Sequence, residues 1–182
     1  MTTSPHTITV NYDKTVESLI KLGKYDWKNN DINSTNFPST QTGKEKVEVE
    51  LLKFDEPTSS KKAIEYMKSI GLRPLNLKEL LHLGIKYPDR QRKDFIVALG
   101  SRWRDPDGDL DVPYLGRDAS DRRLGLACFE GDWNPDRRFA AVRKESLTLK
   151  HLKTKKLDNL DSLTLGEIDE KLDKIIKFFS IK

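Results

Sequence analysis

The order of the predicted elements after residue 58 is the feature that most constrains the fold. A first helix is predicted from residue 59 or 60 to Gly71, and a second begins after Asn76, where Glu79 completes a capping-box pattern. From there on, strand-like segments follow at residues 95–100, 112–116, 122–129 and 138–144. Helices that are separated along the chain from a series of strands favour an α+β fold.

The N-terminal part of the chain predicts an extension of this domain. Residues 6–12 alternate like a strand, a short helix follows from Thr15 to Gly23, and residues 47–54 form a second alternating strand. The polar stretch 24–45 between them indicates a long loop anchored by Tyr25, Trp27 and Phe37. We therefore expect residues 1–46 to pack on a domain formed by residues 47–144.

The C-terminal extension, residues 145–182, differs in pattern from the rest of the chain. Thr164 and Glu167 form a second capping box, and apolar residues then recur at steps of three and four: Leu165, Ile168, Leu172, Ile175 and Phe179. This spacing predicts an amphipathic helix. Such a helix could pack on the body of the domain or join copies of the chain into a homo-oligomer.

Composition excludes several classes of protein. The 182 residues include 33 basic and 29 acidic ones, a net charge of +4, and the two signs are interleaved, so we expect no nucleic-acid partner. No apolar run approaches the roughly 20 residues that span a bilayer, and no signal segment is recognised at the N-terminus, so we expect no membrane association. Synthesis in a reducing cytoplasm is the expectation, with display on a virion or cell surface left open.

Residues that could carry chemistry are scattered. The three histidines lie far apart, and neither a phosphate-binding glycine loop nor a nucleophile elbow occurs, so we expect no catalysis, metal or cofactor. Cys128 is the single cysteine and has no evident histidine base, which favours a variable or buried thiol over a nucleophile. Asp105, Asp107 and Asp109 could ligate calcium, but DPDGD is more typical of a hairpin turn.

The stretch from residue 118 to 144 combines a regular apolar scaffold with residues of no common chemistry. The predicted scaffold consists of Leu124, Leu126, Phe129, Trp133, Phe139 and Val142. Alternation along residues 123–127 predicts that the two leucines are buried and that Arg123, Gly125 and Ala127 point outward. Such a pattern suits a constant scaffold with a changeable surface.

The motifs GLRPLNLKELLHLGIKYP, FIVALGSRW, VPYLG, RRLGLACF and WxxxxRFAAVRK carry a resemblance. Between about residues 64 and 144 the chain resembles the variable proteins of diversity-generating retroelements, which have a C-type-lectin fold with two helices packed on small mixed or antiparallel sheets. In that family a template is copied with errors at adenines. The resemblance implies a variable region at about residues 117–143 that displays Asp118, Ala119, Asp121, Arg123, Gly125, Ala127, Cys128, Gly131, Asp132, Asn134, Pro135, Asp136 and Arg137.

All thirteen displayed residues belong to types that an adenine-rich asparagine codon can reach, whereas Glu130, Trp133 and Lys144 do not. The implied function is therefore receptor-type binding of an unidentified protein or surface ligand, with Arg122, Arg123 and Arg137 as the expected anchors. Two alternatives stay open. One is an enzyme on the fold of formylglycine-generating enzymes, which needs paired cysteines or a histidine triad. The other is an oligomeric phage structural protein assembled through the C-terminal helix.

Overall fold

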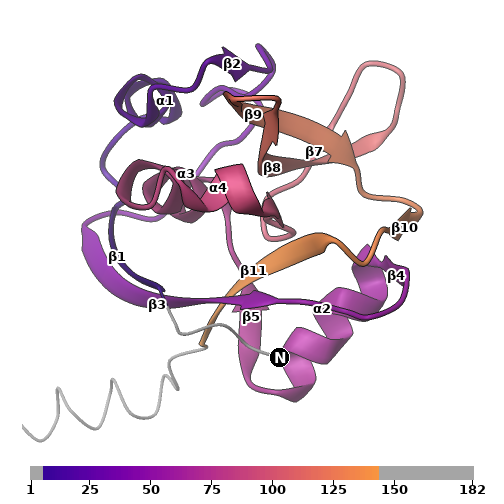
Figure 1. Ribbon diagram of the computed structural model, residues 1–182. Coiled ribbons are helices and arrows are strands. Elements are labelled where there is room, and N and C mark those ends of the chain that lie inside the picture. The colour runs from indigo at the N-terminus through magenta and orange to yellow at the C-terminus, as the bar shows by residue number, and fades with distance from the viewer. Residues whose placement is uncertain (1–5, 144–182) are drawn as a thin grey trace, which may run out of the picture. The chain divides into compact units, whose positions relative to one another are not determined.

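A mixed β-sheet runs through residues 6–143, the part of the chain that the computed structural model describes (Figure 1). The sheet order is β1 (His6–Asn11), β3 (Lys44–Leu52), β11 (Arg137–Arg143), β6 (Phe95–Val97), β8 (Leu110–Asp118), β9 (Asp121–Cys128) and β2 (Trp27–Lys28). β11 pairs with β6 and β2 pairs with β9 in parallel, and the other neighbours are antiparallel. Two short strands, β5 (Leu72–Pro74) and β7 (Trp103–Arg104), pair with β11 and β8. The architecture is α+β, as predicted.

Helices cover both faces of this sheet. On one face, α1 (Val16–Gly23) and α3 (Leu77–Lys86) contribute Leu19 and Leu80 to a core that includes Ile96 and Leu124 of the sheet. On the other face, α2 (Ser60–Ser69) contributes Ala63 and Met67 to a second core with Val97 and Phe139. In Figure 1 β11 lies between α2 and α3. The sheet therefore separates two apolar layers.

Local sequence signals set the helix starts. The Thr15 side chain accepts a hydrogen bond from the Ser18 amide, and Asn76 and Glu79 form the predicted capping box at α3. The carboxylate of Glu79 is fully buried and also accepts two hydrogen bonds from Arg73, at 2.9 and 2.7 Å, and one from the Tyr12 hydroxyl at 2.7 Å. Burial and this contact raise the pKa of Tyr12. The cap is thus also the polar link between α3 and the N-terminal strand.

Several short elements differ from the sequence prediction. β3 begins at Lys44 rather than at residue 47, β2 interrupts the predicted loop 24–45, and β6 ends at Val97 rather than at residue 100. A four-residue helix, α4 (Arg90–Lys93), precedes β6, and a separate pair joins β4 (Thr58–Ser59) to β10 (Asp132–Trp133). Elements of two to four residues are too short to show a hydrophobic period in the sequence. Pairing with distant parts of the chain defines them instead. The predicted C-terminal helix lies outside the described residues.

Candidate ligand-binding surface

The predicted scaffold of residues 118–143 is confirmed at five of its six positions. Leu124, Phe129, Trp133, Phe139 and Val142 are buried, and Leu126 is partly buried against the first core. These side chains belong to both apolar layers of the sheet. The predicted display residues between them are therefore attached to a buried scaffold.

Arg122 is an interior residue, and its prediction as a surface anchor is wrong. Only 7% of it is exposed. Its guanidinium donates hydrogen bonds to the Gly23 carbonyl at 2.7 Å, to the Gly84 carbonyl at 2.9 Å and to Oε1 of Gln91 at 3.0 and 3.2 Å. The ring of Tyr25 lies 5.0 Å from it. Because the two carbonyls lie in the last turns of α1 and α3, this cation joins two helix C-termini to β9.

The expected outward display of Arg123, Gly125 and Ala127 is only partly correct. The three do share one face of β9, but Gly125 is buried and the other two are partly buried. The ring of Tyr114 covers Gly125, where an added Cβ would lie 2.4 Å from the ring carbon Cζ. Alternation identifies side chains that share a face, but it does not reveal that neighbours cover that face.

The tip of the β8–β9 hairpin presents Asp118, Ala119 and Asp121 to solvent. Ala119 has a φ of 50°, in the left-handed region that two-residue hairpin loops require and that alanine disfavours. Helix α4 holds this tip in place. Its buried Gln91 donates hydrogen bonds to the backbone carbonyls of Gly116, at 2.8 Å, and Arg123, at 3.1 Å.

The loop between β9 and β11 is held by contacts with β4 and with the start of α2. The indole of Trp133 donates a hydrogen bond to the Ser60 hydroxyl at 2.7 Å, which in turn donates to the Phe129 carbonyl at 2.8 Å. The two-residue pairing of β10 with β4 fixes the same loop to the start of α2. On this support the predicted display residues Gly131, Asp132, Asn134 and Asp136 are exposed, and Pro135 is partly buried.

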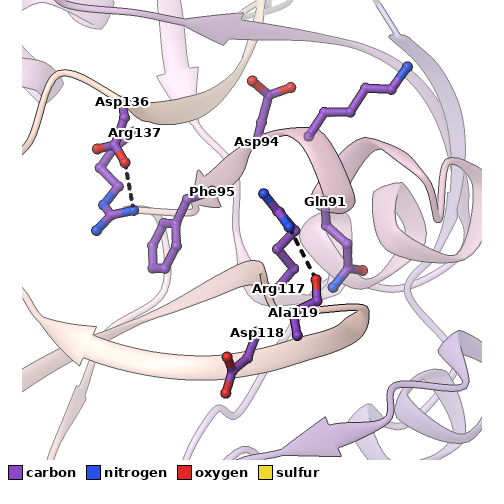
Figure 2. Close-up of a pocket in the computed structure, with 9 residues that line it drawn as sticks. Gln91, Asp94, Phe95, Arg117, Asp118, Ala119, Asp136 and Arg137 are labelled. Carbon is purple, nitrogen blue, oxygen red and sulfur yellow. Dashed lines mark hydrogen bonds and ion pairs between the residues drawn. The ribbon is translucent and has the colours of Figure 1, made fainter.

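The hairpin tip and the end of this loop meet at one pocket, with a volume of ≈ 400 Å³ (Figure 2). Four predicted display residues line it: Asp118 and Ala119 from the hairpin, and Asp136 and Arg137 from the loop and β11. The remaining wall comes from α4, from the start of β6 and from the end of β8, and its residues are Gln91, Lys93, Asp94, Phe95 and Arg117. Display residues 17 to 19 positions apart in the chain thus line a single concave site.

Next to the pocket, one row of residues crosses five strands. Strand register pairs Trp27 with Arg123, Arg123 with Gly116, and Phe95 with Arg137, and the Phe95 ring lies against Gly116. The Arg123 guanidinium lies 5.3 Å from the centre of the Trp27 ring, and that of Arg137 lies 4.0 Å from the Phe95 ring. Both of these predicted display arginines therefore stack on an aromatic ring supplied by another part of the chain.

Trp27 is the residue of this surface that the sequence prediction missed. It was expected to anchor a loop, but 43% of it is exposed at the edge strand β2. Tyr25, predicted for the same role, does pack against the first core. A tryptophan in an otherwise polar segment was the available signal, because exposed tryptophans are over-represented at binding sites.

The other predicted display residues do not reach the pocket. Cys128 is exposed at the far end of β9, and Gly131, Asp132 and Asn134 are absent from the pocket lining. Arg123 stands at the pocket border, where it pairs with Asp118 at 2.6 Å. The structure thus places four of the thirteen residues in the pocket lining, five on β9 and four along the loop between β9 and β11.

The acidic segment 105–109 forms the predicted hairpin turn between β7 and β8. The Asp105 side chain accepts a hydrogen bond from the Asp109 amide at 2.8 Å, and Gly108 has a φ of 96°. Burial, and then the charges of Asp105 and Asp109, raise the pKa of the neighbouring Asp111. Within residues 6–143 no group of three or more histidine, cysteine or acidic side chains is placed to hold a metal ion.

A search of the same residues for a helix long and apolar enough to cross a membrane found none. Comparisons with protein-family models, with curated proteins and with solved structures found no match to the chain.

Proposed function

We propose that this chain is a ligand-binding variable protein of a diversity-generating retroelement. In this proposal a C-type-lectin-like scaffold displays a variable region at about residues 117–143 to a protein or surface ligand. The convergence of the hairpin tip with the end of the loop is the observation that carries the proposal. Two changeable segments that border one pocket can alter one binding site together, whereas scattered changes could not.

The backbone of the hairpin tip supports the same proposal. At a φ of 50°, glycine, asparagine or aspartate fits better than alanine by about 1 kcal/mol. Ala119 occupies the position nonetheless and lines the pocket. A residue that strains the backbone at a pocket wall is expected where substitutions are selected for binding and not for stability.

The arrangement of buried and exposed residues sharpens the expectation. In a diversified region the exposed positions change and the interior ones stay constant, because a changed core loses stability. The exposed positions expected to change are Asp118, Ala119, Asp121, Cys128, Gly131, Asp132, Asn134 and Asp136. The partly buried Arg123 and Arg137 are expected to change as well, because they lie at the pocket. The positions expected to stay constant are Arg122, Leu124, Phe129, Trp133 and Phe139.

Sequencing of the gene and its flanking DNA from a source population tests the proposal. The expected finding is a nearby repeat of the segment that encodes residues 117–143, differing from it mainly where the repeat carries adenines. The codons of the five constant positions serve as the internal control. An invariant segment without such a repeat would contradict the proposal and leave a binding site of fixed specificity.

A further inference from the structure

We propose that the pocket holds a subsite for the carboxylate of an acidic protein segment, built around Arg117 and Lys93. This inference deepens the proposed function, because it names the chemical class of the ligand. Lys93 lies outside the proposed variable region, and Arg117 stands at its first position but is not one of the thirteen predicted display residues. The rim residues Asp118, Ala119, Asp136 and Arg137 would select among acidic partners.

The charge distribution around the pocket is the first argument. Each carboxylate of the wall already has a guanidinium partner, and the pairs are Asp94 with Arg90 and Arg138, Asp118 with Arg123, and Asp136 with Arg137. For Arg117 and Lys93, residues 6–143 provide no carboxylate within ion-pair distance. The lining itself contains three cations and three carboxylates. Because all three carboxylates are paired, Arg117 and Lys93 leave positive charge at the pocket that can attract an anion.

The geometry of Arg117 is the second argument. Its side chain is exposed, and one terminal nitrogen donates a hydrogen bond to the Ala119 carbonyl at 3.1 Å. Since a guanidinium carries five N–H groups, donors remain for a carboxylate of the ligand. Figure 2 shows the ring of Phe95 between the guanidinium groups of Arg117 and Arg137. An apolar surface between two cations suits a side chain that ends in a carboxylate.

The row beside the pocket extends the surface beyond a single side chain. Arg137 stacks on Phe95, and Arg123 stacks on Trp27 at the edge of the sheet. Tryptophan and arginine are the residues that most often dominate binding energy at protein interfaces. A peptide segment that places one carboxylate in the pocket can therefore continue across the row toward Trp27.

Fluorescence anisotropy with a fluorescein-labelled pentaglutamate peptide, titrated with the full chain at low salt, tests the inference. Pentalysine with the same label is the matched probe of opposite charge. We expect binding of pentaglutamate only, and weaker binding as salt is raised. Equal binding of the two peptides, or no binding of pentaglutamate, would overturn the inference.

Two variants locate the site. Arg117→Ala is expected to weaken pentaglutamate binding roughly tenfold, because it removes a charge-assisted hydrogen-bonding group. Arg104→Ala removes the same charge from β7, at the opposite end of β8, and is expected to change binding less than about twofold. Arg117→Lys keeps the charge without the paired donors, so its affinity for pentaglutamate should lie between those of the two alanine variants. Equal effects of Arg117→Ala and Arg104→Ala would refute the pocket as the site.

Competition separates carboxylate from other anions. Inorganic phosphate or a short RNA duplex that displaces the peptide at lower concentration than unlabelled pentaglutamate would refute the carboxylate assignment. The outcome is also independent of the sequencing test. Adenine-directed variation in a protein that does not bind pentaglutamate would leave the proposed function intact and remove only this inference.

Discussion

Replacing Arg122 by alanine is expected to lower the free energy of unfolding by about 3 to 5 kcal/mol. The substitution removes the donors to the carbonyls of Gly23 and Gly84 and to Oε1 of Gln91. Each buried acceptor left without a partner costs about 1 to 3 kcal/mol, and water that enters the vacated space recovers part of the sum. The total is a large fraction of the 5 to 15 kcal/mol that stabilises an ordinary domain.

The neighbouring residue on the same strand provides the matched control. Arg123 pairs with Asp118 across a surface where 35% and 63% of the two side chains are exposed, and it stacks on the exposed Trp27. Exposed contacts of these kinds contribute about 1 kcal/mol or less. Arg123→Ala is therefore expected to change stability far less than Arg122→Ala, although the two residues are adjacent.

Urea denaturation, followed by tryptophan fluorescence and circular dichroism, measures the difference. With a slope of about 2 kcal/mol per molar, Arg122→Ala should lower the midpoint by about 2 M, and Arg123→Ala by less than about 0.5 M. Arg122→Lys keeps the charge but not the planar guanidinium, so its urea midpoint should lie between those of the two alanine variants. This variant can be measured if Arg122→Ala does not fold. Equal midpoints for the two alanine variants would refute the interior role of Arg122.

Three further predictions concern the backbone, pH and packing. Ala119→Gly should raise the free energy of unfolding by about 0.5 kcal/mol in chemical denaturation, because it relieves left-handed strain; a loss would contradict this. Burial lowers the pKa of His82 below its usual 6.5, and its Nε2 accepts the Asn11 amide, so stability should fall as pH drops below about 6.5 and His82→Gln should flatten that slope. Gly125→Ala should cost about 1 to 3 kcal/mol in thermal unfolding, and Tyr114→Ala in the same chain should remove most of that cost if the ring is the obstacle.

Local signals in the sequence predicted most of the regular elements. Side-chain caps at Thr15, Ser59 and Asn76 place the starts of α1, α2 and α3 as expected, because capping depends on residues within one turn. The strands with clear alternation were also predicted, and the turn at 105–109 follows from its proline and glycine. Hydrophobic periodicity and helix capping depend on residues that are close together in the chain, so they can be recognised from the sequence alone.

The candidate site was less accessible to prediction, since long-range contacts build it. Alternation places Arg122 on the same face of β9 as the buried Leu124, but its partner Gly23 lies 99 residues away and cannot be inferred from neighbouring residues. Trp27 reaches the row only through the pairing of β2 with β9. The helix α4, which holds the hairpin tip, is too short to give a helical pattern. Sequence thus predicted the alternating strands of this segment, but not which of its side chains are covered by distant parts of the chain.

Codons 122 and 123 provide the most direct test of the central claim. Both codons encode arginine, and the two arginines are adjacent in β9. Only Arg123 reaches the proposed binding surface. Population sequencing of this codon pair is expected to find adenine-directed substitutions at codon 123 and an unchanged arginine at codon 122. Substitutions at codon 122 as frequent as those at codon 123, or none at codon 123, would contradict the account of a diversified surface on a fixed scaffold.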